Sequence, residues 1–238
     1  MPGLGTIINT AAIVVGGLLG LLFKNLLTKS MEDTLLKASS VCVLFIGIGG
    51  AMQHMLKITD GALETSGSMM LIICFVLGSI VGELLDIEGA FERFGAWLRK
   101  KTHNESDTGF LSAFIHASLT VCIGAMAIVG SIQDGLLGDS SLLCAKAALD
   151  AVIILVMTAS MGKGCIFSAI PVALLQGGVT LLSRVLAPIF TEAAIANLSY
   201  TGSVMIFCVG LNLVWVKKIK VANLLPTLVF AVLYALVF

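Results

Sequence analysis

The sequence has 238 residues, of which 58% are hydrophobic and 12% are charged, and its 14 basic and 14 acidic residues give no net charge. A soluble globular domain carries about 25% charged residues, and the mean hydropathy here is +1.07. This composition excludes a disordered chain, a coiled coil and an ordinary water-soluble enzyme. The even charge balance gives no basic surface for nucleic acid. A polytopic membrane protein remains.

Eight apolar runs follow one another along the chain, each close to the 20 or so residues that cross a bilayer. They are Leu4–Phe23, Ser39–Leu56, Ser68–Leu85, Phe110–Ser131, Leu142–Met161, Cys165–Ser183, Tyr200–Val216 and Val221–Phe238. Long runs without alternation are typical of helices and not of barrel strands. The predicted fold is therefore all-α, a single integral membrane domain over residues 1–238 with about eight transmembrane helices.

The basic residues predict an orientation for this threading. Eleven of the 14 Lys and Arg residues fall on one side, and only Lys57, Lys146 and Arg184 fall on the other. Because cytoplasmic loops are rich in Lys and Arg, both termini are predicted to lie outside. No basic residue precedes the first run, so we expect it to be a span and not a cleaved signal peptide.

Two of the predicted cytoplasmic connections, residues 24–38 and 83–101, are charged and amphipathic. In the second, Glu88 lies on the polar side, opposite apolar residues that include Phe91, Phe94 and Trp97. This pattern predicts either a helix on the inner leaflet, with Arg99-Lys100-Lys101 toward anionic lipid, or a helical extension of the third span.

The layout of the glycines indicates an inverted repeat of three helices, spans 1–3 and 6–8, in residues 1–101 and 165–238, around a central helix pair in residues 110–161. Gly16-Gly17 and a later Gly47 in the first unit correspond to Gly177-Gly178 and Gly210 in the second. Units that begin at the first and sixth spans cross the membrane in opposite directions, as in many secondary transporters. Chance similarity between apolar runs is the alternative.

Small residues at helical spacing mark the faces on which membrane helices pack. We expect such a role for a set of glycines in the first, third and fourth spans: Gly16, Gly20, Gly78, Gly82 and Gly124. The same stripes would suit a homodimer. The six cysteines fall singly in or beside apolar runs, with no C-x-x-C pair, so we expect no metal site and no cofactor.

Asp150 is the most unusual residue of the sequence, because it lies in the fifth apolar run, roughly 12 Å along its helix. An acid at this depth costs on the order of 3 kcal/mol and usually marks an ion or proton path. Lys146 lies four residues earlier, on the same helix face. The two residues predict either a structural ion pair or a site at which Asp150 binds a cation or carries a proton.

Other polar residues in or near the spans extend this candidate ion path. The full set comprises Asp150, Lys146, Asn9, Gln176, Gln133, Asp134, Asn212 and Asn223. A buried amide costs free energy unless it finds partners, so Asn9 and Gln176 should either join helices or line a polar cavity. Gln133 and Asp134 predict an acidic vestibule or a solvated loop. Asn212 and Asn223 flank the Lys217–Lys220 turn and could also cap it.

Several blocks of the sequence resemble one bacterial membrane family. They are GTIINTAAIVVGGLLG (5–20), GELLDIEGAFERFG (82–95), GAMAIVGSIQDG (124–135), FSAIPVALLQG (167–177), GLNL (210–213) and IKVANLLP (219–226). They are similar to the YdfK/YqgA-like proteins, domain of unknown function 554. The resemblance spans essentially the whole chain and implies a multi-pass protein of the bacterial plasma (inner) membrane. It implies no particular activity.

The sequence favours a transporter or channel for a small ion or polar solute, with a path near Asp150 between helix repeats. The alternative is a membrane scaffold, sensor or lipid-interacting protein without transport activity. An enzyme is not expected, because the sequence has no G-x-S-x-G nucleophile motif and no two acids at one predicted depth. The expected partners are the lipid bilayer and the transported solute. We expect Pro171 and Pro226 to kink the sixth and eighth spans.

Overall fold

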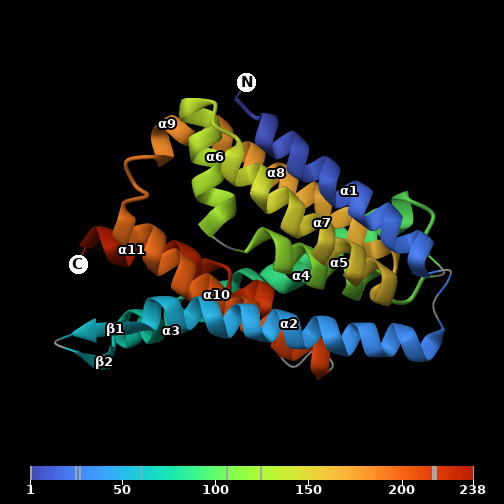
Figure 1. The fold of residues 1–238 in the computed structure, drawn as a ribbon, viewed down its shortest axis with the longest axis horizontal. Coiled ribbons are helices and arrows are strands. Elements are labelled where there is room, and N and C mark those ends of the chain that lie inside the picture. Colours follow the sequence, from blue (N-terminus) through green and yellow to red (C-terminus); the bar gives the residue numbers. More distant parts are fainter. Residues whose placement is uncertain are drawn as a thin grey trace.

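The computed structural model describes residues 2–24, 26, 28–59, 61–105, 107–123, 125–215 and 219–237. Figure 1 shows helices joined by short connections and one two-stranded antiparallel hairpin. In chain order the elements are α1 (Leu4–Lys24), α2 (Lys29–Met55), β1 (Leu56–Thr59), β2 (Ala62–Thr65), α3 (Ser68–Leu85), α4 (Ile87–Lys101), α5 (Phe110–Cys122), α6 (Ala125–Leu137), α7 (Ser141–Met161), η1 (Lys163–Ser168), α8 (Ala169–Leu181), α9 (Ser183–Leu186), α10 (Glu192–Val214), η2 (Val221–Leu224) and α11 (Pro226–Val237).

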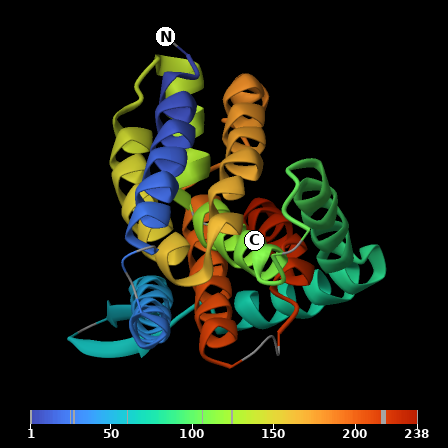
Figure 2. The ribbon, with the colours of Figure 1, turned by 90° about the vertical axis from the view of Figure 1, so that its right-hand side faces the viewer.

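Two groups of helices can be followed in both views, and they meet where α2 contacts α7 and α10 contacts α6 (Figures 1 and 2). In one group, α1 contacts α6, α7 and α8, and α6 also contacts α7 and α8. In the other, α2 packs on α10 and α3 packs on α11. The first group contains the candidate ion-path residues of α1, α6, α7 and α8, so a site formed by them lies in its interior.

Helices α1 and α7 run in the same direction and approach each other at glycines. A methyl group on Gly16 would overlap the carbonyl oxygen of Ala151, and one on Gly20 would overlap that of Leu155. Four residues along α1 therefore correspond to four residues along α7. Because only glycine leaves room for this approach, the two backbones can lie close enough to bring their polar side chains together.

The second group is antiparallel. Gly47 of α2 lies against Phe207 of α10, and Gly210 of α10 lies against Leu44 of α2. Gly78 and Gly82 of α3 lie against Thr227 and Asn223, at the start of α11 and in η2. These directions, and the parallel run of α1 and α7, are the ones that the eight-span threading requires. The number of spans itself stays a prediction.

Six described helices are long and apolar enough to cross a membrane, and α5 with α6 would make a seventh span if they form one broken span. A further, shorter apolar helix covers Val221–Val237. The prediction of one continuous helix over Phe110–Ser131 is wrong, because α5 and α6 are bent by 60°. Ile123 takes an extended conformation that ends α5. Gly124, one of the predicted packing glycines, lies outside the described residues.

Four connections differ from one of the expectations or were not predicted. Helix α2 begins at Lys29 and α10 at Glu192, so both are longer at their N-termini than the apolar runs indicate. The third span does not extend into α4, because Asp86 between them has a left-handed backbone with φ of 48°. The hairpin of β1 and β2 was not predicted, although the sequence Asp60-Gly61 between its strands is a hairpin-turn signal.

The two prolines do not interrupt helices. Pro226 is the first residue of α11 and Pro171 is the third residue of α8. Each follows a short 3-10 segment, η2 or η1. Proline fits the first turn of a helix, where backbone N–H groups have no intrahelical acceptor, so neither residue produces the predicted kink.

Candidate functional site

The Lys146 ammonium and the Asp150 carboxylate form an ion pair inside the first helix group. Lys146 Nζ lies 2.6 Å from Asp150 Oδ2 and 2.8 Å from Oδ1. The Lys146 side chain is 9% exposed and that of Asp150 is 4% exposed. Their spacing of four residues on α7 places them on one face, and the close approach of α1 covers that face.

Two further groups hold this pair from outside α7. Asn9 of α1 donates from Nδ2 to Asp150 Oδ2 over 3.0 Å, and Asn9 is fully buried. Lys146 Nζ also donates to the carbonyl oxygen of Val121 over 2.9 Å. Carbonyls in the last turn of a helix have no intrahelical partner, and α5 ends at Cys122. The ion pair thus lies where the fourth predicted span breaks.

Asp134 of α6 is fully buried, at 0% exposure. Its Oδ2 accepts a hydrogen bond of 3.0 Å from the backbone N–H of Gly5, and its Oδ1 has no hydrogen-bond partner. The solvated-loop interpretation of Asp134 is therefore wrong, since the first turn of α1 covers the carboxylate. Its neighbour Gln133 is only half-buried.

Other buried polar atoms near these helices lack partners. They include Asn9 Oδ1, both amide atoms of Gln176, and the hydroxyls of Thr6 and Thr180. Gln176 lies one turn from Thr180 on α8, so both share a helix face. Thr6 and Thr180 also line a cavity of about 390 Å³, together with Gly135, Ser183 and Arg184. We call the group Thr6, Asn9, Asp134, Lys146, Asp150, Gln176 and Thr180 the polar compartment.

Asn212 and Asn223 lie outside this compartment and hold backbone in the second helix group. Asn212 donates to the carbonyl of Ile219 over 2.6 Å and accepts from the N–H of the same residue over 3.0 Å. Asn223 donates to Glu83 and accepts from the N–H of Glu88, both over 2.6 Å. Asn212 thus bonds to the turn that it was predicted to cap, whereas the Asn223 side chain joins the end of α3 to the start of α4 and does not cap that turn.

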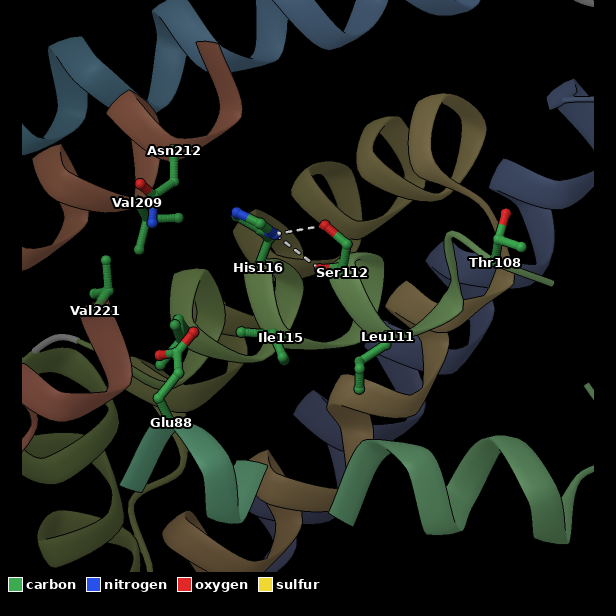
Figure 3. Close-up of a pocket in the computed structure, with 10 residues that line it drawn as sticks. Glu88, Thr108, Leu111, Ser112, Ile115, His116, Val209, Asn212 and Val221 are labelled. Atoms are coloured by element: carbon green, nitrogen blue, oxygen red, sulfur yellow. Dashed lines mark hydrogen bonds between the residues drawn. The ribbon is translucent and has the colours of Figure 1, made fainter. Parts of the chain in front are cut away.

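A second cavity, of about 200 Å³, lies between α4, α5 and α10. Figure 3 shows Glu88, His116 and Asn212 approaching it from three different helices. The polar side of the predicted amphipathic helix is buried at Glu88, which is 6% exposed and whose carboxylate accepts from the N–H of Ala222. His116 Nδ1 lies 2.8 Å from the carbonyl oxygen of Ser112.

Two exposed ion pairs involve residues at or near the junction of α3 and α4. Lys220 pairs with Glu83, and this hydrogen bond raises the pKa of Lys220. Asp86 pairs with Arg93, whose guanidinium lowers the pKa of the Asp86 carboxyl. Within the described ranges, no group of three or more His, Cys, Asp or Glu residues could hold a metal ion.

The long apolar helices, with charged side chains paired in their interior, define a helical membrane protein. The family described as "Protein of unknown function (DUF554)" matches residues 4–236, and the chain belongs to this family. "Uncharacterized membrane protein YdfK" of Bacillus subtilis is 26% identical over 224 residues, which are 94% of this chain and 92% of YdfK. "Uncharacterized protein YqgA" of Escherichia coli is 25% identical over 235 residues, 96% of this chain and 94% of YqgA. No solved structure matches the chain.

Proposed function

We propose that this protein is a transporter or channel for a small ion or polar solute, and that its path runs through the polar compartment of α1, α6, α7 and α8. The observation that carries the proposal is the buried Lys146–Asp150 pair at the break between α5 and α6. Broken spans with charged or polar groups at their ends are the way many transporters build a site at membrane depth.

The surroundings of the ion pair favour a path over a purely structural contact. A structural pair is stabilised when its remaining polar atoms are satisfied and the walls around it are apolar. Here Asn9 Oδ1 and the Gln176 amide have no partner in the described part of the chain. Such atoms are the usual ligands of water or a solute, and they extend the polar surface beyond the pair.

A cavity gives this interior an opening. The residues that line the 390 Å³ cavity include the exposed Arg184 and the buried Thr6 and Thr180. Asn9 follows Thr6 by three residues on α1, and Gln176 precedes Thr180 by four on α8. On α1 and on α8, the polar side chain next to the cavity is therefore followed by a second one on the same helix face. On α1 this second side chain is Asn9, which bonds to Asp150.

The predicted inverted repeat is a second argument for the proposal. If each residue of the first unit is matched with the residue 163 positions later, Gly47 corresponds to Gly210 and Leu44 to Phe207. The contact of Gly47 with Phe207 then corresponds to the contact of Gly210 with Leu44. A two-fold relation between α2 and α10 has this property, and transporters with inverted repeats place their path between the two units. We include the inner bacterial membrane and two outside termini in the proposal.

Flux into proteoliposomes tests the proposal. Vesicles with the full chain would be compared with protein-free vesicles for Na⁺, K⁺, H⁺ and Cl⁻ flux by enclosed dyes, and for small uncharged solutes by light scattering. We expect flux of at least one probe, and its loss in Asp150→Asn but not in Asp139→Asn, which changes an exposed loop acid. The proposal is wrong if Asp150→Asn conducts as well as the unsubstituted chain, or if no probe crosses faster than in protein-free vesicles.

One observation favours the alternative of a lipid-interacting protein. Helix α4 packs one side on α5, while Trp97 on its other side is 56% exposed and Lys100 and Lys101 are exposed. An exposed Trp beside basic residues is typical of a helix at a membrane surface. Lys100→Glu with Lys101→Glu would abolish binding to anionic vesicles under this alternative and leave flux unchanged under the transport proposal.

A further inference from the structure

The polar compartment holds two buried carboxylates but one buried ammonium. Lys146 neutralises Asp150, whereas Asp134 has no ion-pair partner in the part of the chain that the structure describes. A buried carboxylate without a counter-charge costs several kcal/mol. The single backbone N–H of Gly5 satisfies one oxygen of Asp134 and leaves Oδ1 open.

The cavity that contains hydroxyl oxygens without partners is lined by Gly135, the residue next to Asp134. Gly5, whose N–H binds Asp134, is followed directly by Thr6, and Asp134 is followed by Gly135. Gly135 lies against the carbonyl of Thr180 and the hydroxyl of Ser183. Thr6 and Thr180 are each 8% exposed, and their hydroxyls have no hydrogen-bond partner. Both residues line the same cavity as Gly135.

On this basis we infer that Asp134, Thr6 and Thr180 bind a monovalent alkali cation that enters through the cavity. The inference rests on the proposed function and gives its solute class. Hard cations prefer carboxylate, hydroxyl and carbonyl oxygens, and the open atoms here are of these kinds. The one negative charge of Asp134 is neutralised by one monovalent cation. A divalent cation would leave an excess positive charge at this site, and an anion would add a second negative charge.

The position of the site suggests how a cation reaches the ion pair. Gly5 and Asn9 are one turn apart on α1, about 6 Å along the axis, and they bind Asp134 and Asp150 respectively. The two carboxylates thus contact neighbouring turns of one helix. A cation at Asp134 would therefore lie one turn of α1 away from the contact with Asp150, where the Lys146 ammonium now pairs with the carboxylate.

The effect of substituting Arg184 would show whether the site binds a cation or an anion. Arg184 is exposed and lines the cavity, where its guanidinium would attract anions and weakly repel cations, subject to screening by salt. Arg184→Ala should therefore strengthen or leave unchanged the binding of a cation, and should weaken the binding of an anion.

Thermal unfolding of the purified full chain in detergent tests the inference. NaCl, LiCl and KCl would be compared with choline chloride at equal ionic strength, because a ligand that binds only the folded state raises the melting temperature with its concentration. We expect at least one alkali cation to raise it by several degrees, Asp134→Asn to abolish the rise, and Asp139→Asn to keep it. Thr180→Val, which keeps shape and charge, should raise the half-maximal cation concentration about tenfold.

The outcomes separate this inference from the proposed function. The cation site is refuted if no alkali salt exceeds choline chloride, if Asp134→Asn or Thr180→Val leaves the response unchanged, or if Arg184→Ala abolishes it. If the cation binds as expected but no probe crosses a proteoliposome, the site stands as a bound-ion site and transport is refuted. If Asp150-dependent flux occurs without a cation response, transport stands and the cation site is refuted.

Discussion

The Asn9 amide of α1 donates a hydrogen bond of 3.0 Å to the Asp150 carboxylate of α7, across 141 residues of sequence. This contact ties the N-terminal helix to the buried ion pair. It also leaves the amide oxygen of Asn9 without a partner, facing the interior of the same helix group. The ion pair, its amide partner and the open oxygen together are the reason that we assign this interior a function.

Single charge removals should destabilise the fold more than removal of both charges. Asp150→Asn leaves the Lys146 ammonium buried without a counter-charge, and Lys146→Gln does the same to the carboxylate, each at a cost of about 3–5 kcal/mol. The double substitution Lys146→Gln with Asp150→Asn keeps hydrogen-bonding groups at both positions and should cost less than either single change. Unfolding of the three variants in denaturant measures this. Equal, additive losses would show that the two charges do not interact.

Helix packing at glycine should depend on which face the glycine occupies. Gly47→Ala would press a methyl group into the backbone of Phe207, and overpacking of this kind costs about 1–3 kcal/mol. Gly49, two residues away on α2, has no neighbouring atom within 4 Å. Gly49→Ala should therefore be neutral or slightly stabilising. Melting temperatures of the two variants test the α2–α10 contact, and similar values would contradict it.

Asn223 should matter more than the exposed ion pair beside it. Asn223→Ala removes a hydrogen bond to the Glu83 carboxylate and leaves the buried N–H of Glu88 without its acceptor. We expect a loss of about 1–3 kcal/mol. Lys220→Ala removes only the exposed partner of Glu83 and should change little. If the denaturation midpoint moves as much for Lys220→Ala as for Asn223→Ala, the Asn223 side chain is not what stabilises the packing of η2 on α3 and α4.

Asp86 should make stability depend on pH. Its hydrogen bond with Arg93 places the pKa of the folded carboxyl below the ordinary value of 3.8. Because the folded pKa is the lower one, the stabilisation is complete above the unfolded pKa and disappears as the pH falls through the folded pKa. The difference in unfolding free energy between the unsubstituted chain and Asp86→Asn should be constant above about pH 5 and shrink in acid. Arg93→Gln should reduce this dependence, and the hydrogen bond from the Gly89 N–H to Asp86 should keep part of it. A difference that grows in acid would contradict this assignment.

The sequence predicts well what depends on local spacing. The runs Leu4–Phe23, Ser68–Leu85 and Leu142–Met161 each lie within one long helix. The four-residue spacing of Lys146 and Asp150 brings the two into contact because it is one helical turn. The family resemblance is confirmed, since the family match covers residues 4–236. These features need only neighbouring residues or a pattern of residue types.

The contacts that define the polar compartment could not be predicted in this way. Nothing near Asp134 in the sequence indicates that the N-terminus of α1 covers it, because Gly5 is 129 residues away. The break after Cys122 also has no proline to mark it. Glu88 fits a polar helix face in the sequence, and only the approach of η2 buries it. Each of these features depends on which helices become neighbours.

Ion and solute flux through the double variant Lys146→Gln with Asp150→Asn tests the central claim most directly. This variant keeps hydrogen-bonding groups at both positions, so its folding can be verified by its melting temperature before flux is measured. If the buried charges serve passage, the variant should be folded and should lose the flux that the unsubstituted chain shows in proteoliposomes. If the charges serve only to join α1, α5 and α7, the folded variant would conduct as the unsubstituted chain does, and the transport account would be contradicted.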